Sequence, residues 1–315
     1  MNQITEVRNL LDLQQFQKFD NLELIAREVV EGFITGLHRS PFHGFSVEFA
    51  EHRLYNQGES TKSIDWKLYA RTDKLFVKQY EEETNLRCQL VVDISSSMLF
   101  PYSKGSNHLF NKLAFSVYTG AALIYMLRKQ RDAVGLTLFS DEIEYHLHPR
   151  LSSVHAEVMM NKLAEFLRPE NMHLRKTTNT SAALHQIAEN IHKRSLVVIF
   201  SDMIDDEKTE ELFSALRHLR YNKHEVLLFH VTDHKKERKF QFDNRPHRFV
   251  DLETGQSIKL NPWEIKSGYV KSVDEYFEEL KVKCGQYMID LAEADINEDF
   301  SQVLLTYLVK RKKLY

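Results

Sequence analysis

The pattern of hydrophobic and polar positions divides the chain into two parts. In the first part, apolar residues recur at helical spacing over Leu10–Phe33, which predicts one or two helices. Apolar and polar residues then alternate from residue 40 to about residue 83, with Gly44 and Gly58 as turn signals. Such alternation is typical of half-buried strands. We therefore expect residues 1–85 to form a small module of helices and β-strands.

From Leu86 onward, short apolar runs alternate with longer segments of helical periodicity. The apolar runs predict strands at Leu86–Ile94, Ala133–Phe139, Tyr145–His148, Ser195–Ser201, Glu225–Val231 and Tyr287–Leu291. The longer segments predict helices near Leu109–Gln130, Val154–Leu167, Ser181–Lys193, Thr209–Tyr221 and Asp299–Lys310. This alternation of strands and helices is typical of a mainly parallel sheet covered by helices on both faces. We expect residues 86–315 to form one doubly wound α/β domain.

One polar segment interrupts the alternation of predicted strands and helices. Between Lys235 and Trp263, short alternating runs flank the turn signal Thr254-Gly255, which predicts a β-rich insertion with a hairpin. A helix is expected to follow over Val270–Lys283.

Composition and charge narrow the class of protein. The 315 residues are 43% apolar and 28% charged, enough to bury a large core and stay soluble, and the net charge of −3 disfavours a nucleic-acid-wrapping protein. The cysteines, Cys88 and Cys284, form no CxxC pair, which fits a reducing compartment. The uncharged stretch Leu113–Leu127 is too short to span a membrane and predicts a buried helix. With no signal-peptide region at the N-terminus, we expect a cytoplasmic protein.

Two predicted strands end in turns that carry aspartate. The turn in "VVDISSS" contains Asp93, Ser95 and Ser97 in the spacing Asp-x-Ser-x-Ser, and "VVIFSDMIDD" contains Asp202. Ligands of doubly wound sheets bind beyond the carboxyl ends of the strands, where the strand order reverses. Carboxylate and hydroxyl oxygens are hard ligands suited to Mg²⁺ or Mn²⁺. The competing interpretation is that these side chains only cap the next helix and shape a turn.

These residues resemble the metal-ion-dependent adhesion site of von Willebrand factor A domains. The resemblance implies that Ser95 and Ser97 bind Mg²⁺ directly, that Asp93 and Asp202 bind it directly or through water, and that a partner protein supplies a further Glu or Asp. It also implies a threonine ligand from the segment "RKTTNTSAAL", where Thr178 aligns best. The family usually has glycine before this threonine, whereas this chain has Thr177, so both threonines stay candidates.

A second motif resembles a narrower family. "RLYNQGESTKSIDWKLYARTDKLFVKQYEEE" (Arg53 to Glu83) is similar to the signature of the family catalogued as domain of unknown function 58, whose members carry a von Willebrand A-like domain. The resemblance implies a non-enzymatic adaptor or co-chaperone that acts with a MoxR-type AAA ATPase. Many relatives begin with two membrane helices, and none is predicted here.

Other functions have weaker support in the sequence. A hydrolase that uses Ser95 or Asp93 stays an alternative, but no glycines flank the serines as a nucleophile elbow requires, and nothing places His185, His192 or His230 beside them. No phosphate-binding P-loop occurs, so an ATPase partner is favoured over intrinsic ATPase activity. His146 and His148 would share one face of a strand, and without a third metal ligand we expect both to be solvated strand residues. We interpret the basic runs "HKKERK" and "VKRKKLY" as solvated faces or helix C-terminal charges, with a nucleic-acid-assembly scaffold as a further alternative.

Overall fold

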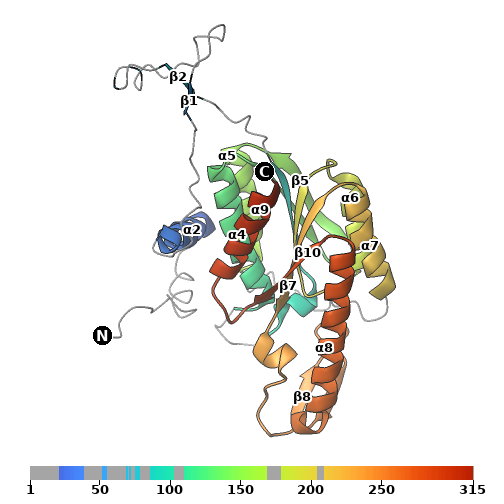
Figure 1. Cartoon of the computed structure of the whole chain (residues 1–315). Helices are drawn as coiled ribbons and strands as arrows, with labels where there is room; N and C mark the ends of the chain where they lie inside the picture. Colours follow the sequence, from blue (N-terminus) through green and yellow to red (C-terminus); the bar gives the residue numbers. More distant parts are fainter. Residues whose placement is uncertain are drawn as a thin grey trace, which may run out of the picture. The chain divides into compact units, whose positions relative to one another are not determined.

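The computed structural model describes residues 21–38, 52–54, 69, 71, 75–78, 86–102, 110–168, 179–203 and 209–314 (Figure 1). Contacts divide the chain into two compact units. One unit comprises the N-terminal segment up to Phe33 together with Leu86–Tyr315, and the other is Ile34–Asn85. In the second unit, strands β1 (His52–Leu54) and β2 (Phe76–Lys78) pair antiparallel. The remainder of the predicted β-module lies outside the described residues.

The described part of the larger unit contains a six-stranded mixed sheet. Its strands lie in the order β10-β7-β6-β3-β4-β5. Their bounds are β3 (Arg87–Asp93), β4 (Ala133–Phe139), β5 (Ile143–Arg150), β6 (Leu196–Ser201), β7 (Glu225–Thr232) and β10 (Asp290–Asp295). All neighbouring pairs are parallel except β4 and β5, which are antiparallel. The prediction of a mainly parallel α/β sheet is confirmed.

Helices cover both faces of this sheet (Figure 1). One face carries α4 (Lys112–Lys129), α5 (Ser153–Glu165) and α9 (Ser301–Leu314), and the other carries α6 (Thr180–Asn190), α7 (Thr209–Tyr221) and the C-terminal part of α8 (Pro262–Gln286). The part of α2 (Leu22–His38) that belongs to this unit contacts α4, where Glu23 forms an ion pair of 2.6 Å with Arg128.

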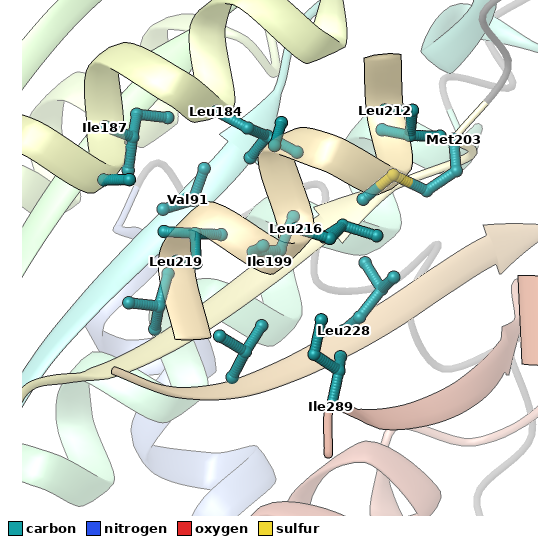
Figure 2. Close-up of a cluster of buried hydrophobic side chains, with 14 of the residues drawn as sticks. Val91, Leu184, Ile187, Ile199, Met203, Leu212, Leu216, Leu219, Leu228 and Ile289 are labelled. Carbon is teal, nitrogen blue, oxygen red and sulfur yellow. The ribbon is translucent and has the colours of Figure 1, made fainter. Parts of the chain in front are cut away.

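Figure 2 shows the apolar cluster between the sheet and the second group of helices. Val91, Ile199 and Leu228 extend from three adjacent strands and meet side chains of α6 and α7. The helix residues of this layer include Leu184, Ile187, Leu212, Leu216 and Leu219. Burying each such side chain contributes about 1.5–3 kcal/mol, so the central strands form a rigid platform. Their carboxyl ends are therefore held in fixed positions.

Helix α4 is the buried helix that the uncharged stretch predicts. Nearly all side chains from Leu113 to Leu127 are buried, with Tyr125 the partly exposed exception. The side chain of Asn111 caps the helix by accepting the backbone N–H of Ala114 at 2.7 Å. Among the described helices, none has the length and apolar character needed to cross a membrane.

The strand order reverses at β3. After β3 the chain adds β4 and then β5 on one side, and it later adds β6, β7 and β10 on the other side. The switch point is therefore between β3 and β6, and these are the two strands that lead into Asp93 and Asp202. In doubly wound sheets this crevice is the usual ligand position.

Three predicted elements differ from the structure. The last strand is Asp290–Asp295 instead of Tyr287–Leu291, because this polar edge strand lacks the apolar run that marks a buried strand. Helix α8 begins at Pro262, well before the predicted Val270, because its first turns are exposed and carry no apolar period. Strand β5 is antiparallel to β4 and is longer than predicted.

The predicted insertion and its hairpin are present. Strands β8 (His247–Val250) and β9 (Ser257–Leu260) pair antiparallel, and Gly255 in the connecting turn has a φ of 75°, which glycine adopts without steric cost. The hairpin and the first half of α8 project from the end of the sheet at which β7 terminates (Figure 1).

Candidate functional site

The Asp93 carboxylate accepts hydrogen bonds at the end of β3. Its Oδ1 accepts the backbone N–H of Ser95 at 2.9 Å, and its Oδ2 accepts the hydroxyl of Ser201, at the end of β6, at 2.7 Å. The hydroxyl oxygens of Ser95 and Ser97 lie 3.0 Å apart. Asp93 and Ser95 are fully buried, whereas Ser97 is partly exposed. The Asp-x-Ser-x-Ser turn therefore gathers one carboxylate and two hydroxyls in one place.

Helix capping does not account for the serine hydroxyls. Ser95 occupies the N-cap position of the short 3₁₀ helix η2 (Ser96–Leu99), but its side chain makes no capping hydrogen bond. The long helix that follows is capped by Asn111 instead. The bond from the Ser95 N–H to Asp93 is an Asx turn, which fits part of the capping interpretation.

Ser201 joins the ends of the two strands. Its hydroxyl donates to Asp93 and accepts the backbone N–H of Met203 at 2.9 Å. Met203 has a φ of 51°, a left-handed conformation that is uncommon for a residue with a Cβ. Its buried side chain packs in the apolar cluster, and Tyr276 of α8 donates a hydrogen bond to its carbonyl oxygen. These contacts hold the turn that carries Asp202.

The charge of Asp93 is poorly compensated. Burial, and next the nearby charge of Asp202, raise the pKa of Asp93 to about 7, although hydrogen bonds from Ser95 and Ser201 oppose the increase. Both hydrogen-bonding partners of this carboxylate within the described residues are neutral. A buried carboxylate without a cation strongly favours protonation or a bound positive charge.

A buried lysine lies beside Asp202. Lys112, the first residue of α4, places its Nζ 2.8 Å from Oδ2 of Asp202 and 2.6 Å from Oε1 of Glu237. The lysine side chain is 1% exposed. Burial lowers the pKa of Lys112, but the two carboxylates outweigh this effect and raise it above the ordinary value. Lys112 is therefore a permanent cation inside the site.

Glu237 belongs to a short π-helical turn, η4 (His234–Arg238), that follows β7. Its Oε2 accepts the backbone N–H of Asp233 at 2.7 Å, while Asp233 caps the same turn by accepting the N–H groups of Lys235 and Lys236. Burial raises the pKa of Glu237, and the ammonium of Lys112 offsets part of that increase. Three strand ends, those of β3, β6 and β7, thus contribute to one polar cluster.

His230, near the end of β7, is neutral at physiological pH. Burial lowers its pKa to about 4, against the opposing influence of Asp202. The other histidines named as candidate bases interact elsewhere: Nδ1 of His185 lies 3.0 Å from Nδ1 of His218, and the ring of His192 lies 6.2 Å from that of His148. Within the described residues, no histidine is hydrogen-bonded to Ser95 or Ser97.

The other histidine pair lies on β5. His146 and His148 share a face, as predicted, with Nε2 of His146 3.3 Å from Nδ1 of His148. His148 is exposed, but His146 is half-buried and bonded to the Thr137 hydroxyl at 2.8 Å, so the expectation that both are solvated strand residues holds only for His148.

Four of the five predicted ligands are described, and they gather at the switch point. Asp93, Ser95 and Ser97 share one turn, and Asp202 is close enough for its charge to act on Asp93. Thr178 and its alternative Thr177 lie outside the described residues.

Sequence reasoning missed three residues of this cluster, Lys112, Ser201 and Glu237, and it named His230 without placing it at the site. Lys112 carries a sequence signal, because a lysine at the first position of a helix opposes the helix dipole, and the other charged residues of this helix, Arg128 and Lys129, lie in its last turn. Glu237 lies within "HKKERK", a run interpreted as a solvated basic face. In the structure Lys235 and Lys239 are exposed, whereas Glu237 contacts Lys112 and Arg238 pairs with Asp274 and Glu293.

The donors present suit a hard cation. Across the part of the chain that the structure describes, no three His, Cys, Asp or Glu side chains are grouped as metal ligands. The candidate donors are instead the carboxylates of Asp93 and Asp202 and the hydroxyls of Ser95 and Ser97. Oxygen donors of this kind, beside a carboxylate whose charge is uncompensated, fit Mg²⁺ or Mn²⁺ better than zinc or copper.

The amino-acid sequence is similar to that of proteins from two mycobacteria. The chain is 25% identical over 213 residues to uncharacterized proteins of Mycobacterium bovis and Mycobacterium tuberculosis, an alignment that covers 67% of this chain and 63% of each relative. The matched part thus spans less than two thirds of the length of these relatives.

Two solved structures are similar in part, both with TM-scores below 0.5. The conserved hypothetical protein BatB of Bacteroides thetaiotaomicron has a TM-score of 0.44 and 13% identity, covering 73% of this chain and 100% of that chain. An aerotolerance-related membrane protein of Bacteroides fragilis has a TM-score of 0.42 and 14% identity, covering 71% and 99%. The family described as "Protein of unknown function DUF58" matches residues 51–275, and the chain therefore belongs to the DUF58 family.

Proposed function

We propose that this chain is a non-enzymatic, metal-dependent protein-interaction module with a von Willebrand factor A-like domain. Asp93, Ser95, Ser97 and Asp202 would hold Mg²⁺ or Mn²⁺, joined by Thr178 as the resemblance to the von Willebrand factor A family implies. The ion would supply a Lewis-acidic position that binds a carboxylate of a partner protein.

The uncompensated charge of Asp93 carries this proposal. The carboxylate is fully buried and close to Asp202, and these two effects raise its pKa to about 7 although hydrogen bonds from neutral groups oppose the increase. Leaving a carboxylate in this state costs free energy unless a cation compensates it. The two adjacent hydroxyls and the position at the strand-order reversal support the same interpretation.

The resemblance to the DUF58 signature suggests the partner. We propose that the chain acts in the cytoplasm as an adaptor or co-chaperone of a MoxR-type AAA ATPase, with the ATPase or its client supplying the acidic residue. Purified chain and ATPase should then co-elute in size-exclusion chromatography with Mg²⁺ and separate when EDTA is added.

Thermal unfolding of chelator-treated protein tests the ion site. Mg²⁺ or Mn²⁺ should raise the melting temperature of the wild type, because a ligand that binds only the native state stabilises by about 2.7 kcal/mol at 100 times its Kd. Asp93→Asn should abolish the response. Without ion, this variant should melt above the wild type because it removes the uncompensated charge while keeping an oxygen acceptor.

Asp290→Asn is the matched control, since Asp290 also pairs with a buried lysine but lies at the opposite edge of the sheet. It should retain the full ion response. An equal response of wild type and Asp93→Asn would refute the ion site. Turnover of ester or phosphate substrates that is lost in Ser95→Ala would instead favour the hydrolase alternative.

A further inference from the structure

Lys112 occupies a position that helix stability alone does not favour. It is the first residue of α4, where the helix dipole disfavours a cation, and its side chain is 1% exposed. Such a charge persists in an interior only when carboxylates compensate it. The role of Lys112 therefore has to be sought in its contacts.

Within the described residues, the contacts place one cation, Lys112, among three acids. The ammonium contacts Asp202 at 2.8 Å and Glu237 at 2.6 Å, and it lies 5.8 Å from the centre of the Phe100 ring. Asp93 makes no ion pair within the described residues and is repelled by Asp202. His230 adds no positive charge at neutral pH. With all three carboxylates ionised, the one ammonium leaves an excess of two negative charges among these groups.

We propose that Lys112 and the divalent ion compete for Asp202, and that Glu237 is the acid that retains the ammonium when the ion binds. The inference rests on the proposed function, since it concerns the same site. A divalent ion matches the excess of two negative charges, but its access to Asp202 is limited by an ammonium that is already bound there. Lys112 and Glu237 thereby set the affinity of the site for the ion.

The competition predicts opposite effects for the two neighbouring substitutions. Lys112→Gln removes the competing cation and raises the negative excess from two to three, so Mg²⁺ should bind at least about tenfold tighter, equivalent to about 1.4 kcal/mol. Glu237→Gln lowers the excess to one and leaves Asp202 as the sole acid on Lys112, so Mg²⁺ should bind about tenfold more weakly. The double variant restores an excess of two and should return toward the wild-type affinity.

Isothermal titration calorimetry with Mg²⁺ and with Mn²⁺, on the chelator-treated full chain at pH 8, measures these affinities. Lys310→Gln is the matched control, because Lys310 also bridges two acids, Glu225 and Asp290, but at the opposite edge of the sheet. Its ion affinity should equal that of the wild type. If Lys112→Gln does not fold without ion, the weaker ion binding expected of Glu237→Gln still tests the competition.

The outcomes separate this inference from the proposed function. Equal ion affinities in the wild type, Lys112→Gln and Glu237→Gln, or shifts in the same direction for both, would overturn the competition while leaving the ion site intact. Binding of ion by Lys112→Gln but not by the wild type would overturn the proposed function, yet it would support competition for Asp202. Opposite shifts, cancelled in the double variant, support both.

Discussion

Two lysines at opposite edges of the sheet make similar three-membered ion clusters with different consequences. At the carboxyl edge, Lys112 bridges Asp202 and Glu237. At the amino edge, Lys310 of α9 bridges Glu225 and Asp290 at 2.8 and 2.6 Å, near the starts of β7 and β10. The acids of Lys310 are 36% and 43% exposed, whereas those of Lys112 are 2% and 20% exposed.

The difference lies in what surrounds each cluster. At the amino edge, Arg220 adds a second cation 3.0 Å from Glu225, and water reaches the acids. Burial alone would raise the pKa of Glu225, but hydrogen bonds from Lys310 and Arg220 lower it. At the carboxyl edge, a third acid, Asp93, is added, and its pKa is raised to about 7. The amino-edge cluster is therefore balanced, whereas the carboxyl-edge cluster has an excess of negative charge.

The largest contrast is expected in stability when either lysine is replaced. In EDTA, Lys112→Met should lower the free energy of unfolding by about 3–5 kcal/mol, because it removes the cation that pairs with Asp202 and Glu237. Lys310→Met should cost about 1 kcal/mol or less, because water solvates its partners. Urea denaturation of both variants measures the difference, and equal losses would contradict the contrast between the edges.

The pH dependence of stability should have opposite signs at the two edges. The native state retains a proton on Asp93 up to about pH 7, whereas the unfolded chain releases it near pH 3.8. Stability from this group therefore falls as pH rises between these values, with a slope of at most about 1.4 kcal/mol per pH unit. Glu225 has a lowered pKa, so its contribution is lost as pH falls.

Asp93→Asn and Glu225→Gln isolate these two contributions. Relative to the wild type in EDTA, Asp93→Asn should gain stability as pH rises from 3.8 to about 7, whereas Glu225→Gln should lose stability as pH rises from acid. Urea denaturation at several pH values measures both differences. The same sign in both variants would show that the carboxyl edge is as well compensated as the amino edge.

The smallest contrast concerns salt. Raising ionic strength toward 1 M shortens the screening length to about 3 Å, which weakens exposed ion pairs more than buried ones. The stability lost in Lys310→Met should shrink by a few tenths of a kcal/mol, while the loss in Lys112→Met stays nearly constant. Urea denaturation in low and high salt, with a chelator present, provides the measurement.

Local patterns in the sequence predicted most of the fold. The apolar runs located β3, β4, β6 and β7 to within one or two residues, because buried parallel strands need continuous apolar sequence. The prediction failed at β10, whose polar residues suit an edge strand, and at the exposed start of α8. In both cases the apolar pattern that marks a buried element was missing from the sequence.

The candidate site was likewise predicted only in part from the sequence. The sequence by itself determined the Asp-x-Ser-x-Ser turn and the aspartate after a second strand. It also determined the expectation that both meet at one edge of the sheet, because local sequence patterns show where each strand ends. Only the tertiary structure decided that Lys112 contacts both Asp202 and Glu237, because these acids lie 90 and 125 positions after Lys112 in the sequence. Buried charge is compensated through space, and no local pattern encodes which distant residue provides the compensation.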